Sequence, residues 1–116
     1  MARFLFYTAV GSGRLYPLIR TLQRLRERGH DVLVYTEREH LGLLDFLDIP
    51  ARAVDPRIEE LADTYWRAGT RLEALARTAG TQVDRAVREV ADLRQALRRH
   101  APDAVVVDCS CWGAAA

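Results

Sequence analysis

Lysine is absent from this chain of 116 residues, and all 17 of its basic residues are arginine. The 16 acidic residues nearly balance them, for a formal net charge of +1, so overall charge predicts neither nucleic-acid nor membrane-surface binding. Only two cysteines occur, Cys109 and Cys111, too few for a disulfide framework or a tetrahedral metal site. We therefore expect no metal and a reducing, cytoplasmic location.

Long apolar runs are also lacking, since none approaches the roughly 18 residues that a membrane helix needs. The apolar residues 4–10 loosely imitate a signal peptide, but no small-residue cleavage pattern follows them, and we assign them to a strand. With 49% hydrophobic and 28% charged residues, the composition is that of a globular protein. The length suits a single folding unit.

Four short apolar segments predict buried strands, over residues 4–10, 32–35, 51–54 and 104–107. Apolar residues spaced by three and four predict helices between them, over residues 15–28, 37–47, 58–79 and 83–97. Gly80 is expected to separate the last two helices. The buried face of the last one should consist of Val83, Val87, Val90, Leu93 and Leu97.

Alternating strands and helices predict an α/β, Rossmann-like open parallel sheet with helices on both faces. The usual doubly wound arrangement would order the four strands 3-2-1-4. Ligands of such sheets bind beyond the carboxyl ends of the strands, where the order reverses between strands one and four. The residues at those two ends are 11–14 and Asp108.

The turn Gly11-Ser12-Gly13 after the first strand partly matches the dinucleotide-binding fingerprint. Tyr16 stands where the third glycine should allow close packing, although Glu37 after the second strand could contact a ribose. A dinucleotide site for NAD or FAD is therefore one alternative, and a simple tight turn is the other.

Motifs in a fixed order run through the whole chain: a glycine turn followed by Pro17-Leu18, the step Arg28-Gly29-His30-Asp31-Val32, and Pro102 to Asp108 before Trp112-Gly113-Ala114. Together they resemble the N-terminal domain of family 1 glycosyltransferases with the GT-B fold, of the bacterial type that acts on natural products. In that family the N-terminal domain binds the acceptor, and a C-terminal domain supplies most of the nucleotide-sugar site.

The resemblance implies that residues 1–116 are an incomplete acceptor-binding domain, lacking the C-terminal nucleotide-sugar domain. The reaction it implies is inverting transfer of a sugar to a hydroxyl of a small natural product. The nucleotide sugar would be a substrate of the full-length protein, with no further cofactor. We expect the chain alone to be inactive.

The family's usual base is a histidine directly after the second glycine, oriented by an aspartate at the end of the fourth strand. Asp108 matches the aspartate, but the histidine position holds Arg14, whose guanidinium stays protonated and cannot act as a base. We predict that Arg14 and Asp108 form an ion pair across the crevice. A cap on the helix containing Trp112 is the alternative role for Asp108.

The other histidines do not replace the missing base. His30 and His100 precede strands and should lie at the far edge of the sheet. His40 follows a strand on the correct side, but we expect it to face solvent.

The resemblance also implies candidate acceptor contacts in the glycine turn and at three aromatic residues in or near the helices after strands two and three: Gly11, Ser12, Gly13, Phe46, Tyr65 and Trp66. Because the resemblance leaves one sheet edge and some apolar helix surface uncovered, we also expect the chain to self-associate. A non-catalytic helper or interaction module for another transferase is the remaining alternative, since Arg14 departs from the family pattern.

Overall fold

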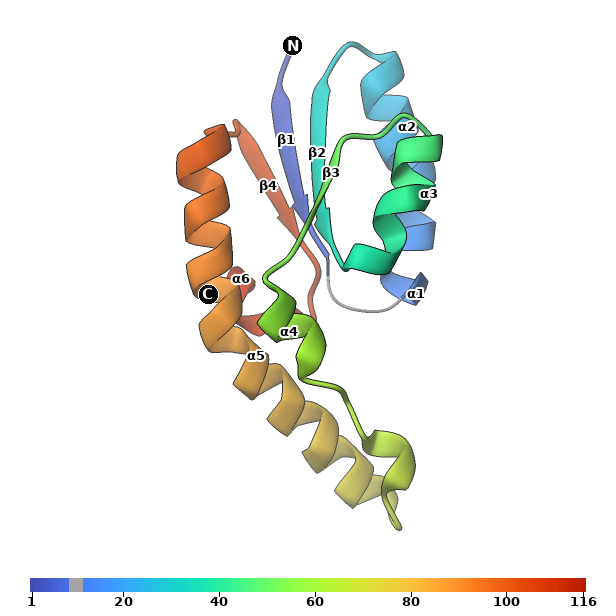
Figure 1. The fold of residues 1–116 in the computed structure, drawn as a ribbon, viewed down its shortest axis with the longest axis vertical. Coiled ribbons are helices and arrows are strands. Elements are labelled where there is room, and N and C mark those ends of the chain that lie inside the picture. The colour runs from blue at the N-terminus through green and yellow to red at the C-terminus, as the bar shows by residue number, and fades with distance from the viewer. Residues whose placement is uncertain (9–11) are drawn as a thin grey trace.

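A computed structural model describes residues 1–8 and 12–116 of the chain (Figure 1). These residues form a parallel sheet of four strands in the order β3-β2-β1-β4. The strands are β1 Arg3–Tyr7, β2 Asp31–Thr36, β3 Ala51–Ala53 and β4 Ala104–Val107. The predicted α/β class and strand order are confirmed. The first strand is shorter than predicted, and residues 9 and 10 lie outside the described residues.

Short helices connect the strands, and one long helix crosses the sheet. They are α1 Ser12–Leu15, α2 Ile19–Glu27, α3 Leu41–Phe46, α4 Pro56–Glu60, α5 Arg71–His100 and α6 Trp112–Ala115, with 3₁₀ turns η1 Tyr16–Leu18, η2 Arg38–His40 and η3 Tyr65–Arg67. The first helical segment begins three residues before the predicted start, and Pro17 lies in the 3₁₀ turn between α1 and α2.

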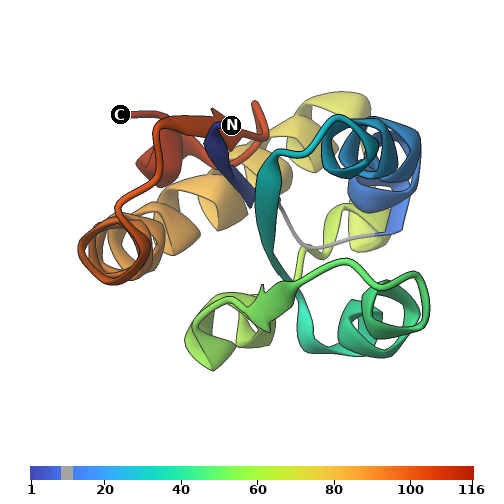
Figure 2. The ribbon, with the colours of Figure 1, turned by 90° about the horizontal axis from the view of Figure 1, so that it is seen from above.

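Helices cover both faces of the sheet, as predicted, with α2 and α3 on one face and α5 on the other (Figure 2). Because side chains alternate along a strand, each face has its own core. Phe6, Val34 and Leu22 belong to the core under α2 and α3. Leu5, Tyr7 and Leu93 belong to the core under α5.

A row of side chains runs across the α5 face near the carboxyl ends of the strands. The parallel register pairs Tyr7 with Val107 on one side and with Tyr35 on the other, and it pairs Tyr35 with Arg52 at the edge strand. The rings of Tyr7 and Tyr35 stack with centroids 6.2 Å apart. Residues in register on adjacent strands share a face, so Arg52 lies beside Tyr35.

The predicted continuous helix over residues 58–79 is wrong over residues 61–70. The chain instead forms the short helix α4, leaves helical geometry after Glu60, makes the turn η3 and enters α5 at Arg71. Gly80 does not interrupt α5, since a single glycine inside a helix costs only about 1 kcal/mol relative to alanine. The amino-terminal half of α5 projects past the end of the sheet (Figure 1).

The predicted buried face of the last helix is also wrong over its first half. Val83 and Val87 are 57% and 72% exposed, whereas Gln82, Arg85 and Glu89 are buried. The polar side chains are turned inward because two of them find partners there. Arg85 donates to the backbone carbonyl of Leu61, and Glu89 accepts hydrogen bonds from α6.

The apolar composition of β4 predicted a buried strand, but β4 lies at the edge of the sheet and is partly exposed. Val105 and Val106, whose side chains point to opposite faces, are 38% and 40% exposed. Their exposure leaves this edge apolar within the described part of the chain. None of the described helices is both long and apolar enough to cross a membrane.

Candidate functional site

The carboxyl ends of β1 and β4 bring Arg14 and Asp108 together, as the predicted strand order requires. Arg14 Nη1 lies 3.9 Å from Asp108 Oδ1, a long ion pair, and the Arg14 side chain is 47% exposed. The same Oδ1 accepts hydrogen bonds from the Ser110 backbone N–H at 2.8 Å and from Ser110 Oγ at 2.6 Å. Asp108 is therefore fixed by the turn that follows it, with Arg14 as a looser partner.

The predicted alternative, in which Asp108 caps the helix containing Trp112, is wrong. Glu89 on α5 does this instead, since its Oε2 accepts from the backbone N–H groups of Gly113 and Ala114 at 3.1 and 3.4 Å. A carboxylate suits this place because the N–H groups of the first helical turn lack partners within the helix. Sequence reasoning missed Glu89 because it lies 24 residues before Gly113 and carries no local signal.

His40 is buried, contrary to the expectation that it faces solvent. It ends the turn η2 beyond β2, where Tyr16 packs against it edge-on with ring centroids 6.0 Å apart. Its Nδ1 lies 3.3 Å from Glu37 Oε1 without hydrogen-bond geometry, and its Nε2 lies 3.7 Å from Glu39 Oε1. The imidazole is thus enclosed by two carboxylates and a tyrosine ring, which leaves little room for a substrate hydroxyl.

Glu37, Glu39 and His40 also offer one donor atom each within 4.8 Å of one another, which is close enough for a shared metal ion. The three residues lie within four positions of one turn, so the chain itself enforces their proximity. Acidic groups often lie this close without an ion, so their proximity does not by itself indicate a metal site.

His30 and His100 lie at the far edge of the sheet, as predicted. His30 Nδ1 accepts a hydrogen bond from the Ala2 backbone N–H, and His100 Nε2 lies 3.0 Å from the Tyr35 hydroxyl. Neither reaches the strand ends that carry Asp108.

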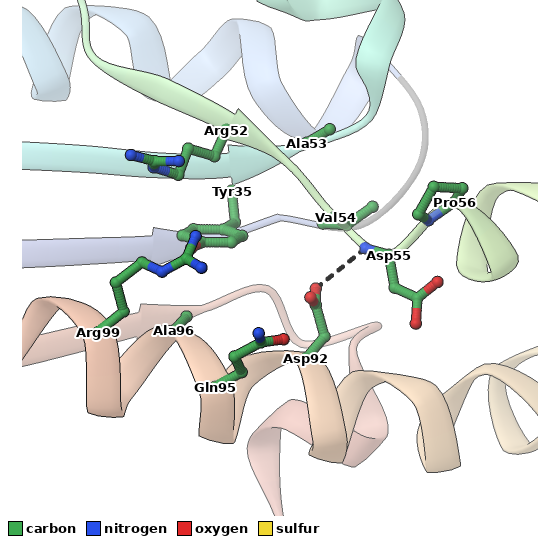
Figure 3. A pocket seen from close by; sticks show the side chains of 10 residues that line it. All are labelled: Tyr35, Arg52, Ala53, Val54, Asp55, Pro56, Asp92, Gln95, Ala96 and Arg99. Carbon is green, nitrogen blue, oxygen red and sulfur yellow. Dashed lines mark hydrogen bonds between the residues drawn. The ribbon is translucent and has the colours of Figure 1, made fainter.

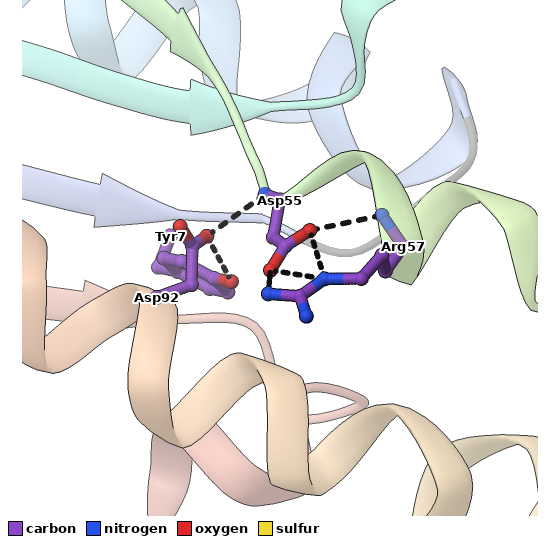
Figure 4. Close-up of polar contacts among 4 residues, drawn as sticks. All are labelled: Tyr7, Asp55, Arg57 and Asp92. Carbon is purple, nitrogen blue, oxygen red and sulfur yellow. Dashed lines mark hydrogen bonds and ion pairs between the residues drawn. The ribbon is translucent and has the colours of Figure 1, made fainter.

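A second polar cluster, which the sequence did not reveal, lies where β1, β3 and α5 meet (Figure 4). Tyr7 Oη donates to Asp92 Oδ2 at 2.7 Å, and the Asp55 backbone N–H donates to the same oxygen at 3.2 Å. Asp55 in turn pairs with Arg57, whose Nη2 lies 2.7 Å from Asp55 Oδ2. The cluster joins three elements that are far apart in sequence.

Burial controls the protonation of this cluster. Desolvation raises the pKa of the Asp92 carboxyl above its ordinary value, although hydrogen bonds from Tyr7 and from the Asp55 backbone oppose the shift. Desolvation and then the charge of Asp92 raise the pKa of the Tyr7 phenol well above its ordinary range. Tyr7 therefore stays protonated and serves as the donor to Asp92.

The residues expected to contact an acceptor are scattered by the fold. Tyr65 and Trp66 are 56% and 66% exposed on η3, which contacts the projecting half of α5. Arg67 stacks on Trp66 with its guanidinium carbon 4.6 Å from the ring centroid. Phe46 is 86% exposed but ends α3, which leads back to the start of β3, so it lies toward the edge away from Asp108.

The glycine turn is only partly described. Gly13 is exposed within α1, where a side chain would meet no other atom within 4 Å. Gly11 lies outside the described residues, as does the side chain of Ser12. Their expected contacts with an acceptor stay predictions.

Several solved glycosyltransferase structures have a similar fold. The SsfS6 glycosyltransferase of Streptomyces sp. SF2575 superposes with a TM-score of 0.76 at 18% identity, over 97% of this chain and 35% of its own. The calicheamicin glycosyltransferase CalG4 gives 0.74 at 19% identity, over 97% and 28% of the two chains. The spinosyn rhamnosyltransferase SpnG gives 0.74 at 13% identity, over 97% and 30%.

The chain therefore shares the fold of the matching part of these glycosyltransferase structures. The chain spans about a third of the length of these glycosyltransferases. No protein-family model matches the sequence, and no curated protein sequence matches it.

Proposed function

We propose that this chain is the acceptor-binding N-terminal domain of an inverting glycosyltransferase that acts on a small natural product. The likeness to glycosyltransferase structures over 97% of the chain supports this proposal most directly. The motifs from the glycine turn to Asp108, and the position of Asp108 where the strand order reverses, agree with it.

The acceptor would lie beyond the carboxyl ends of the strands, against the projecting half of α5. This half and η3 expose large apolar side chains, including Tyr65, Trp66 and Leu75. Leu75, Tyr65, Arg71, Ala74 and Thr78 surround a hollow of about 360 Å³. Apolar and aromatic linings of this kind suit a polyketide or aromatic acceptor.

In the reaction, an acceptor hydroxyl loses its proton as it attacks the anomeric carbon, and the nucleoside diphosphate leaves with the electron pair of the broken bond. Asp108 would orient and charge-balance the groups around that hydroxyl from its fixed place beside Ser110. Arg14 cannot accept the proton, because a guanidinium stays protonated at working pH. The base must therefore be supplied by a group other than the residue at position 14.

The donor would be a nucleotide sugar held mainly by a C-terminal domain. Structures of SsfS6 and of the glycosyltransferase VinC contain thymidine diphosphate, which makes a thymidine-diphosphate sugar the first donor to test. On this account the chain alone contains too little of the donor site for turnover.

The test is a transfer assay with the purified chain, thymidine-diphosphate sugars and a panel of hydroxylated polyketide and aromatic acceptors. We expect no glycosylated product by mass spectrometry, and measurable transfer would refute the claim that this domain is insufficient. Joining the chain to the C-terminal domain of a related transferase should then produce transfer. A catalytically silent fusion that still binds both substrates would favour a different role.

Arg14 favours one alternative, a helper domain that binds and supports another transferase without catalysing transfer. A helper no longer needs a base, so a fixed cation at that position would be tolerated. The substitution R14H in the fused protein distinguishes the two roles. A transferase should gain or keep activity with histidine restored, whereas a helper should stay inactive.

A further inference from the structure

A groove runs between β3 and α5 on the sheet face that carries Tyr7 and Tyr35 (Figure 3). Its volume is about 440 Å³, and Tyr35, Ala53 and Ala96 are among the residues that line it. It exists because α5 covers β1 and leaves the outer part of β2 and the edge strand β3 open on this side.

Two arginines from different elements converge on one end of this groove. Arg52 projects from β3 beside Tyr35, its partner in the strand register, and Arg99 extends from α5 toward the same end of the groove (Figure 3). The charges of Arg52 and Arg99 both act on His100 and on Tyr35. Burial, followed by the charges of Arg52 and Arg99, lowers the pKa of the His100 imidazole. Both also oppose the rise that burial causes in the pKa of Tyr35.

Neither guanidinium has a hydrogen bond or an ion pair with another residue in the described part of the chain. The two acids in the groove lining have other partners: Asp92 accepts hydrogen bonds from Tyr7 and from the Asp55 backbone, and Asp55 pairs with Arg57. Like charges brought together without an acid between them repel each other, and a bound anion would relieve that repulsion. Guanidinium groups also match the geometry of phosphate and carboxylate oxygens.

We propose that Arg52 and Arg99 bind a phosphate or carboxylate group of a small molecule in this groove. Tyr35, whose hydroxyl lies 3.0 Å from His100 Nε2, borders the anion. Asp92 and Gln95 also line the groove, where they suit hydroxyl groups. The volume of about 440 Å³ exceeds what an inorganic anion fills, so the ligand carries more than its anionic group.

This groove shares no lining residue with the proposed acceptor hollow, and the proposal does not depend on the proposed function. α5 ends at His100, shortly before β4 begins, so Arg99 lies toward the amino ends of the strands. Asp108 lies at the opposite ends.

The test is a titration of the 116-residue chain with inorganic phosphate and, separately, with citrate at constant ionic strength, followed by amide chemical shifts in NMR. We expect saturable shifts centred on Arg52, Tyr35 and His100 with at least one of the two anions, and the stronger response identifies the anion class. The substitutions R52Q and R99Q should each weaken binding roughly five- to tenfold.

The control is R98Q, which removes the same charge from the neighbouring position on α5 but lies outside the groove. It should leave the affinity unchanged. The proposal is overturned if neither anion gives saturable shifts, if R52Q and R99Q bind as well as the unchanged chain, or if R98Q weakens binding equally. All three arginines are exposed, and thermal unfolding of each variant confirms that it remains folded.

Discussion

Arg14 Nη1 lies 3.9 Å from Asp108 Oδ1, so the helix that follows β1 and the residue that follows β4 meet beyond the carboxyl ends of these adjacent strands. Asp108 is held more firmly by Ser110 than by Arg14, because two short hydrogen bonds from Ser110 reach the same oxygen. This difference in contacts sets a first prediction about stability.

The substitution R14Q should change the free energy of unfolding by less than about 1 kcal/mol, because long, exposed ion pairs contribute little. The substitution D108A should cost more, about 1 to 2 kcal/mol, since the Ser110 turn then loses its acceptor. Urea unfolding of both variants measures the difference. Equal losses would show that the ion pair, and not the turn, holds Asp108.

Gly113 and Gly80 should respond in opposite ways to alanine. A methyl group on Gly113 would lie 2.0 Å from the Ala86 carbonyl oxygen, so α6 could no longer pack against α5, and G113A should cost at least about 2 kcal/mol. A methyl group on Gly80 would meet no other atom within 4 Å, so G80A should stabilise α5 by about 0.5 to 1 kcal/mol. Thermal unfolding of the pair compares them directly; a stable G113A variant would contradict the packing of α6.

Glu89 should matter for stability through its hydrogen bonds to α6. The substitution E89A leaves the N–H groups of Gly113 and Ala114 buried without an acceptor and should cost about 1 to 3 kcal/mol. The substitution E89Q keeps an oxygen acceptor and should cost clearly less, because burial already disfavours the charged carboxylate by raising its pKa. Indistinguishable losses in urea unfolding would rule out this capping role.

Asp92 should make stability depend on pH. Its pKa is raised in the folded state, so the folded chain keeps the proton at pH values where the unfolded chain has lost it. Its contribution therefore favours folding most below the ordinary value of 3.8 and declines as the pH rises through the folded-state pKa. The substitution D92N, which keeps an oxygen for Tyr7, should abolish this decline and be neutral or stabilising at pH 7.

Unfolding curves between about pH 4 and 7 test this prediction. The variant D84N provides the control, because Asp84 is exposed on the same helix. Its pH profile should run parallel to that of the unchanged chain. A D92N profile with the same slope would show that Asp92 is not the titrating group.

Self-association should involve the exposed apolar stripe of α5, defined by Leu72, Leu75, Val83 and Val87. The double substitution V83E/V87E should lower the sedimentation coefficient at high concentration, because two charges on this stripe oppose its burial against another apolar surface. A single monomeric species for the unchanged chain at every concentration would contradict the prediction.

The sequence predicted the sheet well because each strand is short, apolar and followed by a crossover that allows few arrangements. It also placed Asp108 beside the helix start that carries Arg14, since strand order brings the segments that follow β1 and β4 together. His30 and His100 could be assigned to the far edge for the same reason.

The errors concern contacts between distant elements. Periodicity assigned Val83 and Val87 to the core, but the partners of Arg85 and Glu89 lie on segments that only the folded chain brings to α5. The cluster of Tyr7, Asp55 and Asp92 joins three elements and has no local motif. Helical periodicity shows which residues share a face, but it does not show which face packs against another element.

The measurement that tests the central claim most directly is an NMR titration of the chain with hydroxylated aromatic and polyketide acceptors, with thymidine diphosphate, and with NAD and FAD. The account predicts saturable shifts from an acceptor around Asp108, Trp66 and the amino-terminal half of α5, and none from the nucleotides at these residues. Saturable binding of NAD or FAD beside Gly13, with no response to any acceptor, would contradict it.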